Sequence, residues 1–265
     1  MAQEQFVEGV LNFRPADIAD IYFYDPGPGI PRQPEFAPQK VRIHDARAEH
    51  LNASIDRQGF ELVSTTADIA FNSDPALVHK SYYPAMERLV KEHLSAARVF
   101  AFDHDFRSSN VTEQTEHLRP AVMGVHNDYT ELSAPQRVRD LLPAEAEGLL
   151  KRRFVFINVW KPIGHPAEGT PLAMCDAGSL GPDDLTLLRL RYRERNGQIH
   201  GAKFNPMQRW FYYPTMQTSE ALLLKVFDSD ESRACFSLHS AFTDPTARKD
   251  APPRQSIEVR TIAFF

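Results

Sequence analysis

The second half of the chain is a series of short apolar segments, each about as long as a β-strand and most of them separated by turns that contain proline or glycine. An apolar strand has to bury at least one face against another layer of structure. Many short strands joined by such turns are typical of a sandwich or a barrel. We therefore expect a mainly β fold, with strands over residues 154–160, 172–175, 210–213, 222–227, 234–242 and 256–265.

The first half of the chain carries the helical patterns. Residues 75–97 have Pro75 in a first turn and apolar residues at helical spacing, which predicts a helix. Pro84 lies inside it and predicts a kink or two consecutive helices. Because the helices precede the strands, we expect them to flank one outer face of the sheet. Shorter elements are expected as helices over 45–58 and 135–150, the latter interrupted near Pro143, and as strands over 60–66, 99–103 and 121–128.

Residues 1–40 are expected to form an N-terminal arm or lid. The run from Tyr24 to Pro34 is so dense in proline and glycine that it excludes regular structure. No repeat and no break in composition divides the rest of the chain, so we expect residues 1–265 to form a single domain.

His126 and Asp128 are the strongest candidates for chemistry. Residues at i and i+2 project from the same face of a β-strand, and an apolar run precedes His126. His239, far downstream in another expected strand, can complete the set. Two imidazoles and one carboxylate bind one face of an Fe(II) ion and leave positions open for a cosubstrate and dioxygen. A histidine-x-aspartate tripeptide is a weak signal when it stands alone.

The last strand provides a second candidate site. Alternation places Arg254, Ser256, Glu258 and Arg260 on one face and the apolar residues on the other. A guanidinium binds a carboxylate through two charge-assisted hydrogen bonds, and a hydroxyl two residues away can add a third. We expect Arg254 and Ser256 to bind the distal carboxylate of 2-oxoglutarate. Arg260 is the second choice, because an ion pair with Glu258 would also explain it.

Five sequence blocks carry a resemblance to a known family. They are His126-Asn-Asp-Tyr-Thr, Asn158-Val-Trp-Lys-Pro-Ile, Cys175-Asp-Ala-Gly-Ser-Leu, Gln208-Arg-Trp-Phe-Tyr-Tyr-Pro-Thr-Met and the closing Pro-Pro-Arg-Gln-Ser-Ile-Glu-Val-Arg. With these blocks the chain resembles a group of Fe(II)/2-oxoglutarate-dependent oxygenases that contains the subunit-like protein of cephalosporin 7α-methoxylation, the fungal gibberellin desaturases and the AsaB-type hydroxylases of natural-product clusters. Lys161 stands where an arginine is common in that group.

The resemblance implies a double-stranded β-helix with flanking helices and a catalytic iron held by His126, Asp128 and His239. It also implies 2-oxoglutarate and dioxygen as cosubstrates. The expected activity is hydroxylation, desaturation or oxidative ring formation at an unactivated carbon of a small natural-product-type substrate, coupled to decarboxylation of 2-oxoglutarate to succinate. Tyr129, Trp210, Tyr212 and Lys161 are the expected substrate-lining residues, although aromatic strands also fill barrel cores.

Three alternatives remain open on the sequence. A non-catalytic binding partner of an oxygenase could keep the barrel, although it would have no need for three iron ligands. A metal-dependent hydrolase or isomerase would leave Arg254 and Ser256 without a role. Asp103-His104-Asp105 is the rival cluster, but adjacent strand residues point to opposite faces, so His104 cannot join both carboxylates. A role in lining the site and a structural hydrogen-bond cluster are the two interpretations of that cluster.

Composition excludes other classes of protein. A net charge of −5 and a pI near 6.1 argue against a nucleic-acid-binding surface. No apolar stretch reaches the ~20 residues of a membrane span. Two cysteines without a secretory signal fit a reducing compartment, so we expect a cytoplasmic protein that binds a small-molecule substrate and neither nucleic acid nor membrane. Monomer and homodimer both stay open.

Overall fold

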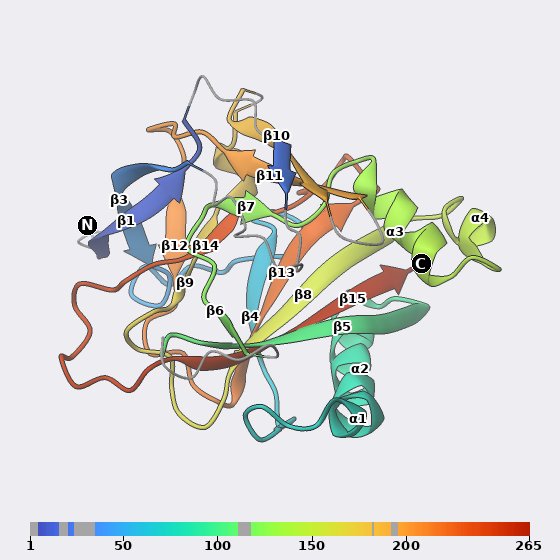
Figure 1. Cartoon of the computed structure of the whole chain (residues 1–265), viewed down its shortest axis with the longest axis horizontal. Coiled ribbons are helices and arrows are strands. Elements are labelled where there is room, and N and C mark those ends of the chain that lie inside the picture. The colour runs from blue at the N-terminus through green and yellow to red at the C-terminus, as the bar shows by residue number, and fades with distance from the viewer. Residues whose placement is uncertain (1–4, 16–20, 24–34, 111–117, 182, 192–195) are drawn as a thin grey trace.

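In the computed structural model of the chain, two curled β-sheets face each other (Figure 1) and form a double-stranded β-helix, or jelly roll, which confirms the predicted fold. The structure describes residues 5–15, 21–23, 35–110, 118–181, 183–191 and 196–265. Within these residues one sheet has nine strands in the order β1-β3-β12-β9-β14-β7-β11-β10-β2, and the other has six in the order β4-β13-β8-β15-β5-β6.

The strands of the larger sheet are β1 (Phe6–Phe13), β2 (Ile21–Phe23), β3 (Ala37–Asp45), β7 (His126–Asn127), β9 (Leu172–Cys175), β10 (Leu185–Arg191), β11 (Asn196–Ala202), β12 (Trp210–Tyr212) and β14 (His239–Ala241). Those of the smaller sheet are β4 (Phe60–Ser64), β5 (Arg98–Ser108), β6 (Leu118–Pro120), β8 (Phe154–Pro162), β13 (Glu220–Asp228) and β15 (Gln255–Phe264).

Strand β8 shows how the smaller sheet is covered on both sides. All of its residues are buried, and alternate residues of a strand point to opposite faces. Ile157 and Val159 belong to the apolar cluster that the helices cover, whereas Trp160 packs with Met174 and Phe211 of the facing sheet. The inner face of β8 therefore borders the interior of the barrel.

The helices of residues 75–94 flank the outer face of the smaller sheet, as predicted, whereas those of residues 133–149 pack against Phe154 and Phe156 on its inner face. Helix α1 (Pro75–Leu77) continues through a π-helical turn (Val78–Tyr82) into α2 (Tyr83–Leu94), and Figure 1 shows α2 beneath β5. The predicted interruption at Pro84 is confirmed: the irregular turn ends just before this proline, which has no N–H to donate. Helices α3 (Ser133–Leu141) and α4 (Ala146–Leu149) are separated near Pro143, also as expected.

Two predictions for the N-terminal part are wrong. Strand β1 pairs along its full length with β3 and belongs to the larger sheet, so the first part of residues 1–40 is not an arm. Residues 24–34, the expected lid, lie outside the described residues. Residues 45–58 form turns instead of a helix, because the Asp45 carboxylate accepts hydrogen bonds from the N–H groups of Arg47 and Ala48 and His50 has a positive φ of 51°.

The strands that carry the metal-ligand candidates are shorter than predicted. The expected strand over 121–128 is reduced to β7, and that over 234–242 to β14. Strands β1, β2, β3, β6, β10 and β11 were not predicted. In β10 and β11, polar residues such as Arg189 and His200 interrupt the apolar pattern. Among the described residues, no helix is long and apolar enough to cross a membrane.

Candidate metal centre and cosubstrate site

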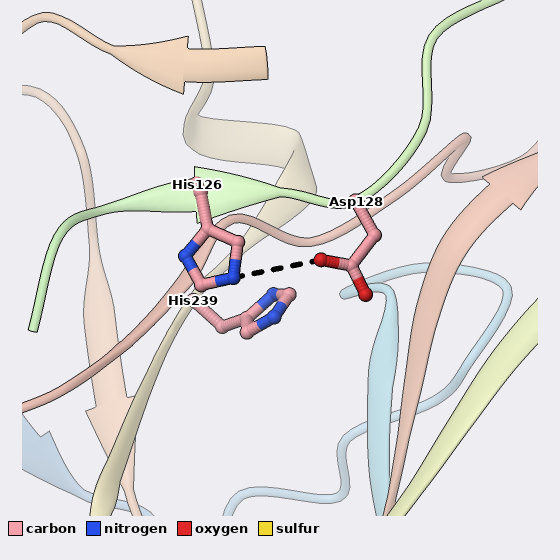
Figure 2. A group of neighbouring side chains, drawn as sticks. All are labelled: His126, Asp128 and His239. Atoms are coloured by element: carbon pink, nitrogen blue, oxygen red, sulfur yellow. Dashed lines mark ion pairs between the residues drawn. The ribbon is translucent and has the colours of Figure 1, made fainter. Parts of the chain in front are cut away.

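The structure brings His126, Asp128 and His239 together inside the barrel (Figure 2). His126 of β7 lies opposite His239 of β14 in the antiparallel register, and one ligand atom from each of the three side chains lies within 4.8 Å of the others. His126 Nε2 is 3.5 Å from Asp128 Oδ1, and the centres of the two imidazole rings are 4.5 Å apart. Two imidazoles and one carboxylate at this spacing fit one face of an Fe(II) ion.

Backbone carbonyl groups orient both imidazoles. His126 Nδ1 lies 2.8 Å from the Gly124 carbonyl oxygen, and His239 Nδ1 lies 3.2 Å from that of Ser237. When Nδ1 donates its proton to a carbonyl, Nε2 keeps its lone pair for a metal. Burial lowers the pKa of His126 to about 4, and it also lowers the pKa of His239. Both imidazoles are therefore neutral near pH 7, as metal ligands must be.

Asp128 is held on its other side by one hydrogen bond and one ion pair. Asn158 Nδ2 donates a 2.7 Å hydrogen bond to Asp128 Oδ2, and Arg260 Nε lies 3.6 Å from the same oxygen. Burial alone raises the pKa of the Asp128 carboxyl, but the positive charge of Arg260, the two histidines and the Asn158 hydrogen bond together lower it well below its ordinary value. Asp128 is consequently anionic at any physiological pH, as a carboxylate that binds a metal must be.

Arg254 is a buried cation with an incomplete set of partners. Its side chain is 1% exposed, Nη1 donates to the Thr170 carbonyl oxygen at 2.9 Å, and its guanidinium lies over the Trp160 ring at 5.5 Å. Arg254 Nε and the Ser256 hydroxyl, both buried, have no hydrogen-bond partner within the described part of the chain. Burial lowers the pKa of Arg254. A carboxylate bound here would supply the missing acceptor and charge.

Arg260, in contrast, is saturated by carboxylates. Its Nη1 lies 3.0 Å from Asp103 Oδ2, and its Nη2 lies 2.9 Å from Asp105 Oδ2 and 2.8 Å from Glu258 Oε1. The ion pair with Glu258 that the sequence suggested is therefore present. Asp103 and Asp105 share a face of β5 and both contact Arg260, whereas His104 points to the other face and bonds to Tyr83 at 2.9 Å. The rival cluster is a structural network beside the candidate metal centre.

The strand pairing of the larger sheet places the expected aromatic residues, Trp210 and Tyr212, on the face opposite the candidate metal centre. Phe211 of β12 pairs with Met174 of β9, which pairs with His239 of β14, and paired residues project from the same face. Phe211 therefore shares the face of His239. Trp210 and Tyr212 project from the opposite face into a separate apolar cluster, so the structure does not bring the expected pair to the candidate site.

Of the other two expected substrate-lining residues, Tyr129 lies near the candidate metal centre and Lys161 does not. Lys161 follows Val159 by two residues and shares its outward face, where its amine bonds to the Ala67 carbonyl oxygen and lies 4.0 Å from Asp68. It is not brought to the candidate metal centre. Tyr129 directly follows Asp128, is partly exposed, and has its ring centre 4.3 Å from that of Phe156. Tyr129 therefore lies beside the candidate metal centre, and its role in lining the substrate stays a prediction.

Comparisons with known proteins agree with this geometry. A family model described as "Oxidoreductase/YMDC permease-like domain" matches residues 13–264. The Fe(II)/2-oxoglutarate-dependent dioxygenase nvfI of Aspergillus novofumigatus is 32% identical over 236 residues, covering 86% of this chain and 84% of that protein. The hydroxylase/desaturase efuI of Hormonema carpetanum is 31% identical over 254 residues, with the same coverage of 86% and 84%.

A solved structure is similar over almost the full length. The iron and α-ketoglutarate-dependent endoperoxidase NvfI superposes with a TM-score of 0.87 at 28% identity, covering 98% of each chain. The chain therefore belongs to the family of Fe(II)/2-oxoglutarate-dependent oxygenases, which confirms the resemblance drawn from the sequence.

Several residues of the site were missed by sequence reasoning. Thr170 gave no signal, because it contributes a backbone carbonyl. Asn158 and Trp160 lie in a block that resembles the family, and their alternation on one strand was the available signal. Both project from the inner face of β8, where Asn158 reaches Asp128 and Trp160 lies against Arg254.

Proposed function

We propose that the chain is a single oxygenase domain that oxidises an unactivated carbon of a small, mostly apolar molecule, with Fe(II) as its metal and 2-oxoglutarate and dioxygen as cosubstrates. The observation that carries the proposal is the pairing of two features in one barrel. A set of two histidines and one aspartate converges on a point, and a separate buried guanidinium, Arg254, has no carboxylate partner among the residues that the structure describes. A metal-dependent hydrolase would need the first feature only.

The residues have distinct roles in this proposal. His126, Asp128 and His239 would hold the iron, which supplies the oxidative chemistry on dioxygen when it is bound. Arg254 would bind the distal carboxylate of 2-oxoglutarate through a charge-assisted contact, and Ser256 would donate its unused hydroxyl to the same group. The Trp160 ring lies against the guanidinium, 5.5 Å from its central carbon.

Arg254 is preferred to Arg260 as the anchor because their surroundings differ. Arg260 already contacts carboxylates through Nη1 and Nη2. Releasing it would leave buried anions, Glu258 among them, without their counter-charge, at a cost of several kcal/mol. Arg254 requires no such exchange, since its Nε has no acceptor to give up in the described part of the chain.

An apolar substrate is supported by the aromatic side chains next to Asp128. Tyr129 and Phe156 are in ring contact, and Phe102 extends this wall at 6.0 Å from Phe156. Relatives are named as an endoperoxidase and as hydroxylase/desaturases. For this chain we keep hydroxylation, desaturation and oxidative ring formation as the proposed outcomes.

The non-catalytic alternative is not favoured, because the metal-ligand set is complete and the relatives are named as enzymes. Both cysteines are free, which fits our proposal that the protein works in the reducing cytoplasm.

Succinate production tests the proposed function. The purified protein is given Fe(II), 2-oxoglutarate and dioxygen together with candidate apolar natural products, and succinate and oxidised product are measured. We expect succinate from the protein alone and none from Asp128→Ala. Strict dependence on a second protein, with no iron retained by this one, would overturn the proposal in favour of the binding-partner function.

A further inference from the structure

The two carboxylate oxygens of Asp128 have different surroundings. Oδ1 faces the imidazole of His126 at 3.5 Å. Oδ2 accepts the 2.7 Å hydrogen bond from Asn158 and faces Arg260 Nε at 3.6 Å. Asn158 and Arg260 lie opposite each other in the register of β8 and β15, so both approach Oδ2 from the same sheet. One oxygen is thus left for a metal while the other is held by the protein.

The carboxylates around Arg260 explain why only its Nε faces Asp128. Asp103 occupies Nη1, and Asp105 and Glu258 share Nη2. A guanidinium is planar and presents its donors in a rigid fork, so fixing both Nη atoms also fixes the direction of Nε. Glu258 and Asp105 are buried, which makes the arrangement costly to disturb. The three carboxylates therefore hold the Nε–H of Arg260 in a fixed direction toward Asp128.

We propose that Asn158 and Arg260 are positioning residues that hold Asp128 as a one-oxygen ligand of the iron, with Asp103, Asp105 and Glu258 holding Arg260 in turn. This inference rests on the iron site of the proposed function and assigns Arg260 a role different from cosubstrate binding. A carboxylate free to turn could bind the metal through both oxygens and occupy a position that the cosubstrate or dioxygen needs. Groups that orient metal ligands in this way typically contribute 10- to 100-fold in metal affinity or activity.

Two variants test the proposal independently. Asn158→Leu removes the hydrogen bond to Asp128 while keeping a side chain of similar size. Arg260→Lys keeps the charge but loses the planar fork. Thr261→Val is the matched control, because Thr261 is adjacent to Arg260, buried, and bonded on the opposite face to the Ile157 carbonyl oxygen. It reports what the loss of a buried hydrogen bond in β15 does by itself.

The measurements separate metal binding from cosubstrate binding. Anaerobic Fe(II) affinity is measured by competition with a coloured chelator, and 2-oxoglutarate affinity is measured on metal-saturated protein. We expect roughly 10- to 100-fold weaker Fe(II) binding in Asn158→Leu and Arg260→Lys, a changed visible charge-transfer band of the Fe(II)–2-oxoglutarate complex, and a wild-type response in Thr261→Val. A merely structural role would lower thermal stability without moving the band.

The outcomes distinguish this inference from the proposed function. If the wild-type protein retains no Fe(II), the proposed function fails. If the wild type retains Fe(II) but both variants bind it within about twofold of the wild type, with an unchanged band, only the positioning role is overturned. Should Arg260→Lys not fold, Asn158→Leu decides, since removing a neutral amide leaves no buried charge unpaired.

Discussion

Replacing Arg254 by methionine removes the proposed 2-oxoglutarate anchor and keeps most of the packing. The methionine side chain can follow the path of the arginine stem against Trp160, which the guanidinium now covers at 5.5 Å. The charge and the unused Nε donor are lost. The substitution therefore isolates the electrostatic contribution from the apolar one.

The expected magnitude follows from the burial of the site. Arg254 is 1% exposed, so its contact with a carboxylate would be fully desolvated, and losing one partner of such a pair costs roughly 2–4 kcal/mol. That corresponds to about a 30- to 900-fold weaker Kd for 2-oxoglutarate. The ligand-free protein should be as stable as the wild type or more so, because a lone buried guanidinium is unfavourable before the anion arrives.

Calorimetric titration of 2-oxoglutarate into protein loaded with Mn(II) in place of iron measures the Kd without turnover, and thermal unfolding of the ligand-free protein measures its stability. Arg248→Gln is the control, since that arginine is half exposed and pairs with Glu168 at the surface. Metal affinity should be unchanged in Arg254→Met. Wild-type binding of 2-oxoglutarate by Arg254→Met would refute the assignment of this residue.

Three further predictions concern other residues of the site. Asp128→Ala should lose Fe(II) binding and succinate formation together, and normal iron loading by that variant would dispose of the ligand assignment. Lys161→Met should leave iron and 2-oxoglutarate affinity within about twofold of the wild type by the same titrations, because the side chain faces Ala67 on the outer side of the sheet; a larger loss would return Lys161 to the site. Because burial lowers the pKa of His126 to about 4, the unfolded metal-free chain binds more protons than the folded one between pH ~6.5 and that value. The free energy of unfolding should then fall by up to about 1.4 kcal/mol per pH unit on acidification through this window. In urea unfolding, the free energy of unfolding of His126→Gln should fall less on acidification than that of the wild type. An equal fall in both proteins would contradict this prediction.

The sequence allowed the strand alternation of the C-terminal half to be predicted. Arg254, Ser256 and Arg260 do share one face of β15, and Ile257 and Val259 pack beneath the helices on the other. This worked because Ile257, Val259 and Ala263 mark one face as apolar, with Thr261 as a buried polar residue among them. A shift by one residue would bury the charges under the helices.

The choice of aromatic face could not be made in the same way. All residues of β12 are buried, whichever face of the sheet they project from. The hydrophobic pattern therefore cannot tell whether Trp210 or Phe211 faces the metal centre. Only the pairing of β12 with β9 and of β9 with β14 relates them to His239, and such pairings join segments far apart in the chain.

The acidic network around Arg260 could not be predicted from the sequence for the same reason. Asp103 and Asp105 are more than 150 residues from Arg260 along the chain, and their role depends on the pairing of β5 with β15. The sequence indicated only the local pair of Arg260 with Glu258. The contacts that distinguish Arg254 from Arg260 are therefore tertiary, and they decide which of the two can receive a new anion.

Anomalous diffraction at the iron edge from crystals soaked anaerobically with Fe(II) and 2-oxoglutarate tests the central claim most directly. We expect a single iron peak among His126, Asp128 and His239, with the distal carboxylate of 2-oxoglutarate bound to Arg254 and Ser256. Iron bound elsewhere, or a cosubstrate carboxylate bound to Arg260 in place of its acidic partners, would contradict it.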